Sequence, residues 1–164
     1  MVSFLRIERF VARIAERVNW VAAAAVVFMM LITTADVIMR AFRHPILGTY
    51  EIVGFTGVVV IAFSLPYTSI QKGHIAVEFL VQRLPWLARV IINIINAFIS
   101  IVLFAVIAWQ CAKYAETMKI SGEVSSTLQM PTYPFLYGIS FGCLLLCVVL
   151  FIEFLRQFRG AEIE

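Results

Sequence analysis

The sequence predicts an all-α integral membrane protein with four transmembrane helices, because of the length of its apolar runs and its composition. Apolar runs cover residues 18–38, 49–69, 86–114 and 133–154. A helix needs roughly 20 such residues to cross about 30 Å of hydrocarbon. The chain is 62% hydrophobic and only 14% charged. This leaves no room for a separate soluble domain, so we expect residues 1–164 to form a single membrane domain.

The N-terminal residues 3–17 predict an amphipathic helix that lies in the membrane interface. Apolar side chains recur there at helical spacing, and arginines and glutamates fill the remaining positions. The alternative is a plain extension of the first span. That span, residues 18–38, contains the unbroken row Ala22 to Ala25, and such small side chains let a neighbouring helix approach closely.

The second span, residues 49–69, also carries small residues in its interior, Gly54 and Gly57. The runs lack the alternating pattern of barrel strands, so a helix is the structure that satisfies the backbone in lipid. Pro66 lies near the end of this run. We expect it to kink or end the helix at about Leu65.

The second half of the chain predicts one more interfacial helix and two long spans. Residues 71–85 interleave apolar and polar side chains, which favours a short helix in the interface. Span three, residues 86–114, begins at Trp86, an aromatic residue of the type found at headgroup level. At 1.5 Å per residue this run is about 43 Å long, so it must tilt or project beyond the outer surface. Before span four, residues 133–154, Pro131 suits the first turn of the helix.

The basic residues predict the orientation. Of the 13 Lys and Arg residues, nine lie in the two tails and the second loop, and four lie on the other side. The positive-inside rule then places both termini in the cytoplasm. The net charge of +3 is explained by these loop charges and does not indicate nucleic-acid binding.

Three ionisable residues near the outer surface are the main candidates for a polar site. Asp36 and Arg40 are four residues apart, so they share a helical face and can form an ion pair. Glu51 lies at a similar depth on the next span, near enough in the topology to join them. One interpretation is a clasp that fixes spans one and two together, or both to a partner subunit; the other is a proton or ion relay. Their position away from the midplane favours the clasp.

Other reactive residues are poorly arranged for chemistry. His44 and His74 fall on opposite sides of the membrane in this topology, so they cannot be axial ligands of one haem. Cys111, Cys143 and Cys147 all fall inside spans, where we interpret them as small apolar residues. No catalytic combination shares a face and no glycine loop suits a phosphate. We therefore expect no enzyme activity, cofactor or metal in this chain.

Four motifs occur in register along the chain. They are ADVIMR at the end of span one, GTYEI at the start of span two, KGHIAVEF in the inner loop and SSTLQMP before span four. Together they resemble the small membrane subunit of the tripartite ATP-independent periplasmic (TRAP) transporters of bacteria and archaea. The resemblance covers nearly the whole chain. Glu78 is one departure, because aspartate is more usual there in the family, but the charge is kept.

The resemblance implies a non-catalytic permease subunit of the inner membrane. Such a subunit binds a much larger membrane subunit, which carries the substrate and the coupling sodium, while a periplasmic substrate-binding protein delivers organic acids such as C4-dicarboxylates or sialic acid. In the family's elevator-like symport, the small subunit is expected to be a static scaffold. Its characteristic residues, assigned to helix packing and subunit docking, are here Asp36, Arg40, Glu51, His74, Glu78, Ser126, Leu128 and Pro131. In the outer loops, Arg43, Lys119 and Glu123 are candidates for contact with the binding protein.

Two other function classes fit the sequence less well. A small exporter that works alone as a homodimer would need a carboxylate near the middle of the membrane, and the predicted spans hold none there. A membrane redox protein would need histidines inside spans or cysteines at the periplasmic surface. Neither pattern occurs in the sequence.

Overall fold

The computed structural model describes residues 2–71 and 86–161, and this part of the chain forms four α-helices. They are α1 (Val2–Ala41), α2 (Thr49–Ile70), α4 (Trp86–Ser121) and α5 (Tyr133–Ala161). Each contains a segment that is long and apolar enough to cross a membrane. The predicted all-α fold with four membrane-spanning helices is therefore confirmed.

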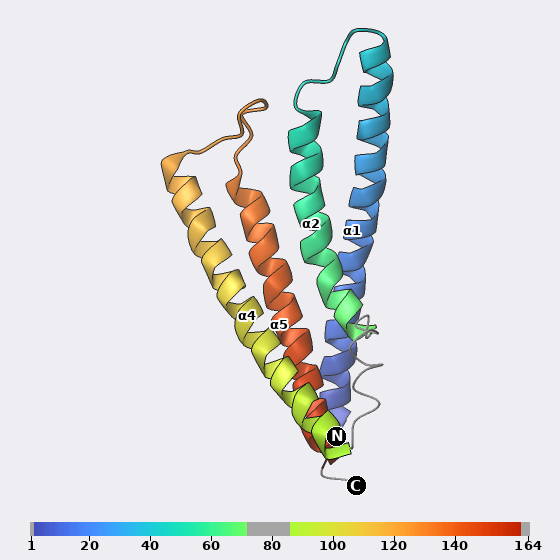
Figure 1. Ribbon diagram of the computed structural model, residues 1–164, viewed down its shortest axis with the longest axis vertical. Coiled ribbons are helices and arrows are strands. Elements are labelled where there is room, and N and C mark those ends of the chain that lie inside the picture. Colours follow the sequence, from blue (N-terminus) through green and yellow to red (C-terminus); the bar gives the residue numbers. More distant parts are fainter. Residues whose placement is uncertain (1, 72–85, 162–164) are drawn as a thin grey trace.

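The helices lie side by side in the order α4, α5, α2, α1 (Figure 1). Helix α5 packs against α4 and α2, and α2 packs against α1. The share of buried residues in the apolar segment of each helix is 28% for α5 and 17% for α2, but only 11% for α1 and 6% for α4. The central pair is thus α2 and α5, and α1 and α4 form the edges of an open row.

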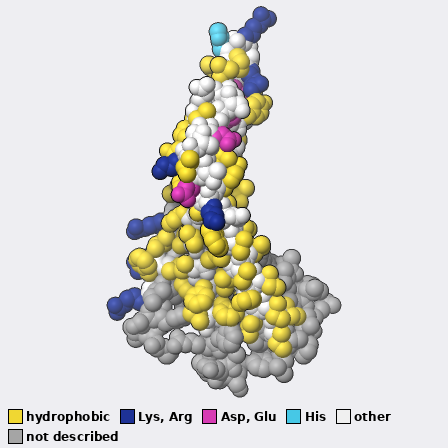
Figure 2. Space-filling model, turned by 90° about the vertical axis from the view of Figure 1, so that its left-hand side faces the viewer, with side chains coloured by type: hydrophobic (Ala, Val, Ile, Leu, Met, Phe, Trp, Pro, Cys, Tyr) yellow, Lys and Arg dark blue, Asp and Glu magenta, His cyan; other side chains and the backbone are white. Residues whose placement is uncertain are grey.

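The two ends of this row differ. At one end, here called the loop end, lie the α1–α2 loop (residues 42–48) and the α4–α5 loop (residues 122–132) (Figure 1). At the other, the tail end, α1 begins and α5 finishes (Figure 1). Viewed from the α4 side, apolar side chains fill a broad area, with charged side chains of both signs above it (Figure 2). Such a surface needs lipid or another protein to cover it.

A glycine permits a close approach of the two central helices. A Cβ atom added to Gly142 of α5 would overlap the backbone carbonyl of Ala62 in α2. Ala62 is itself only 3% exposed. Because a membrane interior gives helices no hydrophobic drive to associate, close backbone contact of this kind is a main source of their attraction.

Two aromatic pairs accompany this glycine contact between α2 and α5. The rings of Phe55 and Phe135 stack with their centroids 4.5 Å apart, and those of Phe63 and Phe141 meet edge to face at 6.2 Å. The contacts between the two helices progress from Phe55–Phe135 to Ala62–Gly142, so residue numbers increase in the same direction and α2 and α5 run parallel. We call the Gly142–Ala62 contact and these two aromatic pairs the central seam.

Two interhelical hydrogen bonds join α5 to α4. The Ser140 hydroxyl, which is buried, donates to the Ala108 carbonyl at 2.9 Å. About two turns farther along α5, the Cys147 thiol donates to the Ile101 carbonyl at 3.8 Å. Each polar side chain thereby finds an acceptor away from water, as an apolar environment requires.

Helix lengths differ from the prediction in three places. Helix α4 continues past residue 114 to Ser121, because the extra turns place Ala115 and Met118 in buried positions. Helix α1 is continuous from Val2, so its N-terminal part extends the first span, as in the alternative interpretation. Pro66 is fully buried inside α2, which continues to Ile70, so the predicted helix end near Leu65 is wrong.

Two further expectations concern the loops. The interfacial helix predicted at residues 71–85 lies almost entirely outside the described residues. Pro131 precedes α5, which begins at Tyr133, so its predicted place in the first turn is wrong. Pro134 occupies that turn instead, where a missing N–H costs nothing.

The central seam predicts that Gly142→Ala destabilises the protein. The added methyl group must push α5 away from the Ala62 carbonyl, and overpacking of this kind costs about 1–3 kcal/mol. Gly138→Ala is the matched control, because a Cβ atom there meets nothing within 4 Å. Thermal unfolding of the detergent-solubilised protein should show a lower midpoint for Gly142→Ala and an equal or higher one for Gly138→Ala. Equal midpoints for the two variants would contradict the close contact.

Candidate functional site

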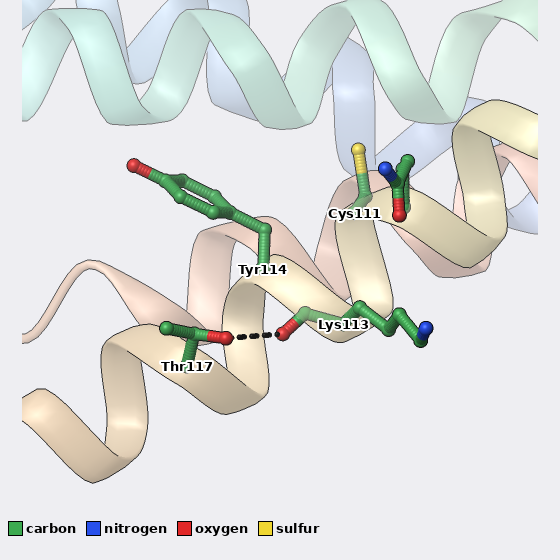
Figure 3. Close-up of a pocket in the computed structure, with 5 residues that line it drawn as sticks. Cys111, Lys113, Tyr114 and Thr117 are labelled. Carbon is green, nitrogen blue, oxygen red and sulfur yellow. Dashed lines mark hydrogen bonds between the residues drawn. The ribbon is translucent and has the colours of Figure 1, made fainter.

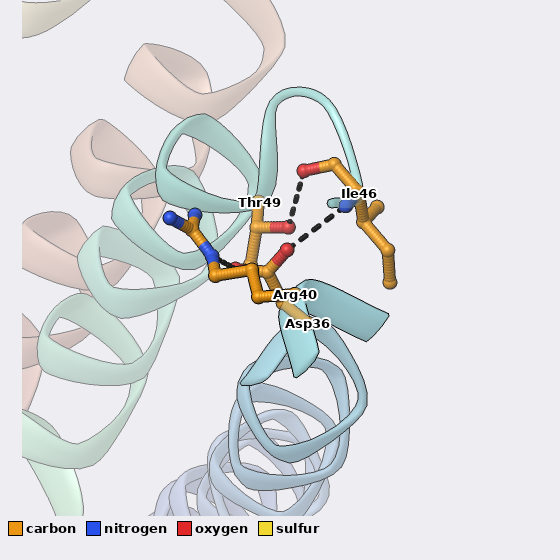
Figure 4. Close-up of polar contacts among 4 residues, drawn as sticks. All are labelled: Asp36, Arg40, Ile46 and Thr49. Carbon is orange, nitrogen blue, oxygen red and sulfur yellow. Dashed lines mark hydrogen bonds and ion pairs between the residues drawn. The ribbon is translucent and has the colours of Figure 1, made fainter. Parts of the chain in front are cut away.

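The polar residues of the loop end form two clusters, one on each side of α2. The first is centred on Asp36, which lies near the end of α1 and is 5% exposed (Figure 4). Its Oδ2 accepts a hydrogen bond from Arg40 Nε at 2.8 Å, and its Oδ1 accepts one from the Ile46 backbone N–H at 2.9 Å. Nearby, the Thr49 hydroxyl donates to the Ile46 carbonyl at 3.0 Å. The carboxylate thus ties the α1–α2 loop to α1.

The ion pair expected from the spacing of Asp36 and Arg40 is present. Its two members differ in exposure, with the Arg40 side chain 47% exposed and that of Asp36 only 7%. The Arg40 guanidinium carbon also lies 5.4 Å from the ring centroid of Tyr50, on α2. Arg40 therefore links α1 to α2 while part of its cation stays at the surface.

The second cluster is centred on Glu51, in the first turn of α2. One carboxylate oxygen accepts hydrogen bonds from the Ser125 hydroxyl at 2.6 Å and the Leu128 N–H at 2.9 Å. The other oxygen accepts one from the Thr127 N–H at 2.8 Å. Hydrogen bonds to an ionised acceptor are the stronger kind. Glu51 therefore holds the α4–α5 loop against the start of α2.

Leu128 makes a second contact between this loop and α2. Gly48, the residue before α2, has a φ of 81°, and a Cβ atom there would overlap the Leu128 side chain. Glycine thus satisfies both the left-handed backbone and the close approach. Within the loop, the Ser125 N–H donates to the Met130 carbonyl at 2.9 Å, and Val124 bridges to Pro131. The loop is a compact hairpin pinned at its tip.

The structure corrects the predicted place of Glu51. Glu51 does not join Asp36 and Arg40; its hydrogen bonds reach the α4–α5 loop instead. The reason is the helix order, since α5 lies beside α2 and brings its preceding loop over the Glu51 carboxylate. The expected single clasp is therefore two separate ones.

Sequence reasoning did not single out the serine that contacts Glu51. Ser126 is exposed, whereas its neighbour Ser125 donates to Glu51. Thr127, which contributes its backbone N–H, was missed as well. The run of three hydroxyl residues signals a polar loop. Which hydroxyl faces α2 depends on the turn, and that turn includes Gln129 at a φ of 52°.

The remaining predicted site residues divide into two groups. Leu128 and Pro131 lie in the pinned hairpin, at its tip and at its base. His74 and Glu78 lie outside the described residues. The structure therefore brings the loop-end residues into two clusters, while the inner-loop pair stays a prediction.

The part of α4 nearer the loop end bears a shallow, open depression (Figure 3). Its lining consists of residues from that one helix, namely Gln110, Cys111, Lys113, Tyr114 and Thr117. The hydrogen bond in this group, from the Thr117 hydroxyl to the Lys113 carbonyl at 3.1 Å, lies within the helix. Across the described parts of the chain, no group of His, Cys, Asp and Glu is arranged to hold a metal ion. The two loop-end clusters are therefore the candidate functional site.

The second cluster predicts that Glu51→Gln loosens the α4–α5 loop. The amide that replaces one carboxylate oxygen cannot accept a hydrogen bond, and the negative charge is lost. Hydrogen bonds to charged groups contribute about 1.5–3 kcal/mol, so the Thr127 and Leu128 amides should exchange with deuterium roughly tenfold faster. Glu123→Gln, at an exposed carboxylate of the same loop, is the control. Unchanged exchange in Glu51→Gln, or the same increase in Glu123→Gln, would show that Glu51 does not pin the loop.

Comparison with known proteins places the chain in a family. The family model "Tripartite ATP-independent periplasmic transporters, DctQ component" matches residues 29–160, a range that includes both loop-end clusters, the last part of α1, all of α2 and α4, and nearly all of α5. No curated protein and no solved structure is significantly similar to the chain. On the match over most of its length, the chain belongs to the DctQ-component family of TRAP transporters.

Proposed function

We propose that this chain is the non-catalytic small permease subunit of a TRAP transporter and the static scaffold for a large membrane subunit. The family supplies the class of transporter component. The observation that carries the scaffold role is the open row, in which the apolar segments of the edge helices are only 11% and 6% buried. A helix that is apolar all round and so little covered by its own chain must lie against lipid or another protein.

Small residues on the two central helices support docking of another membrane helix. At Gly54 of α2 and Gly138 of α5, a Cβ atom would meet nothing within 4 Å. These glycines are not needed for packing within the chain, unlike Gly142. Small side chains on open surfaces allow a partner backbone to approach closely in lipid. In our proposal, helices of the large subunit cover part of the row at these positions.

The basic residues support an orientation with the loop end in the periplasm and both termini in the cytoplasm. Nine of the 13 Lys and Arg residues belong to the tails and the second loop. In this orientation the loops held by Asp36 and Glu51 face the periplasmic binding protein. Arg43, Lys119 and Glu123 are exposed at that end. Charges of this kind affect the rate of encounter more than the final affinity.

The hydrogen bonds of the two clusters support the roles that we propose for the different subunits. Their carboxylates are occupied by donors of this chain, so they hold loops in place and do not offer a solute site. We assign solute and sodium binding to the large subunit, and delivery of an organic acid to the binding protein. A subunit with fixed loops and a rigid seam is suited to be the frame against which another domain moves.

Reconstitution tests this proposal. The tagged chain should recover the large membrane subunit of the same organism during purification. Vesicles that contain both subunits should take up an organic acid when a sodium gradient and the binding protein are present, and vesicles with this chain alone should take up none. Solute movement by the chain alone would contradict the scaffold role and favour an independent exporter.

Arg40 is the residue of choice for a variant in this assay. Arg40→Gln removes the cation from the buried Asp36 and from the surface beside Tyr50, so recovery of the large subunit should fall roughly fivefold or more. Arg43→Gln is the control, because Arg43 is exposed in the adjacent loop. Thermal unfolding of the variant alone separates a docking defect from a folding defect. Normal recovery with Arg40→Gln would remove this residue from the interface.

A further inference from the structure

A stripe of arginines runs along the first part of α1. Arg6, Arg9, Arg13 and Arg17 follow one another at intervals of three or four residues, so they share one face of the helix. All four are exposed. The same face continues with Trp20, which is 70% exposed. We call these residues the arginine stripe, with Trp20 at its end.

This stripe points away from the rest of the protein. Ala15 and Ala22, which are 0% and 2% exposed, mark the packed face of α1. Ala15 follows Arg13 by two residues, which is about 200° around a helix of 3.6 residues per turn. Two carboxylates are adjacent to the stripe in sequence, Glu8 beside Arg9 and Glu16 beside Arg17, and Glu16 is exposed. Arg9, Arg13 and Arg17 form no ion pair with the acidic side chains that the structure describes, which do not include that of Glu8.

The position of the arginine stripe along α1 places it at one surface of a bilayer. Asp36 and Arg40 mark the polar boundary at the loop end of α1. From Asp36 back to Arg17 the helix spans about 29 Å at 1.5 Å per residue, close to the roughly 30 Å thickness of the hydrocarbon. Arg17 therefore lies at the opposite boundary, and Arg13 lies about 6 Å farther out, within the headgroup layer.

Along this single face the side chains change from cationic to apolar. Beyond Trp20 the same face carries Val27 and Leu31, which are 55% and 66% exposed. An anionic phospholipid complements this face, because its phosphate head group can lie against the arginines and its acyl chains against the apolar side chains. Guanidinium groups bind phosphate oxygens in pairs, and the indole ring prefers the headgroup level. An acidic protein segment would match the arginines but not the long apolar continuation.

We propose that the arginine stripe and Trp20 bind the headgroup phosphates of anionic phospholipids, so that this face of α1 lies against lipid. The large subunit then covers other parts of the row. This inference concerns the chain by itself and does not depend on its role in transport.

Quenching of Trp20 fluorescence by brominated lipids tests the proposal. The full chain carrying Trp86→Phe and Trp109→Phe keeps Trp20 as its reporter. It is reconstituted in phosphatidylcholine vesicles that contain a minor fraction of either brominated phosphatidylglycerol or brominated phosphatidylcholine. An arginine near an anionic surface contributes about 1 kcal/mol, so phosphatidylglycerol should be enriched roughly fivefold at Trp20.

The enrichment should disappear in Arg13→Gln/Arg17→Gln and persist in Lys113→Gln/Lys119→Gln, which removes two exposed cations from α4. Equal quenching by the two brominated lipids in the parent chain would overturn the proposal, as would an unchanged preference in the arginine variant. The last arm uses the complex with the large subunit. Quenching that persists there supports a lipid-facing stripe, and its loss with both lipids would assign the stripe to a protein contact.

Discussion

The contact between α2 and α5 determines the shape of this protein, because it is the main contact between the α1–α2 and α4–α5 helical pairs. In lipid the helices gain little from apolar burial, so close packing must hold them together. Gly142 lets the α5 backbone approach the Ala62 carbonyl, and two aromatic pairs add further contacts between α2 and α5. With the centre fixed in this way, α1 and α4 remain at the edges with most of their surface open.

The two loop-end clusters follow from the same arrangement. Since α5 lies beside α2, the loop before α5 reaches the start of α2, where the Glu51 carboxylate accepts its donors. On the other side of α2, Asp36 fixes the α1–α2 loop through Ile46. The result is a row of helices with one rigid end and two broad apolar faces. For a component of a TRAP transporter, such a shape suits a frame more than a solute site.

The sequence predicts correctly those features that depend only on residues close together in the chain. Runs of apolar residues define membrane helices, and the four-residue spacing of Asp36 and Arg40 alone predicts their ion pair. Sequence reasoning failed where the answer depends on which helices are neighbours. Glu51 hydrogen-bonds to residues more than 70 positions away, and nothing local distinguishes Ser125 from Ser126. The length of α4 was also underestimated, because hydrophobicity marks where the membrane ends and not where the helix ends.

The open row is the central claim, and distances between spin labels test it most directly. Labels at the exposed positions Ala24 of α1 and Val106 of α4 report the separation of the edges, and labels at Ile61 of α2 and Leu144 of α5 report the centre. Neighbouring helices pack with their axes about 8–10 Å apart, so an open row predicts an edge-to-edge separation of roughly 25 Å, well beyond that of the central pair. Equal separations for the two pairs would indicate a closed bundle and contradict the account.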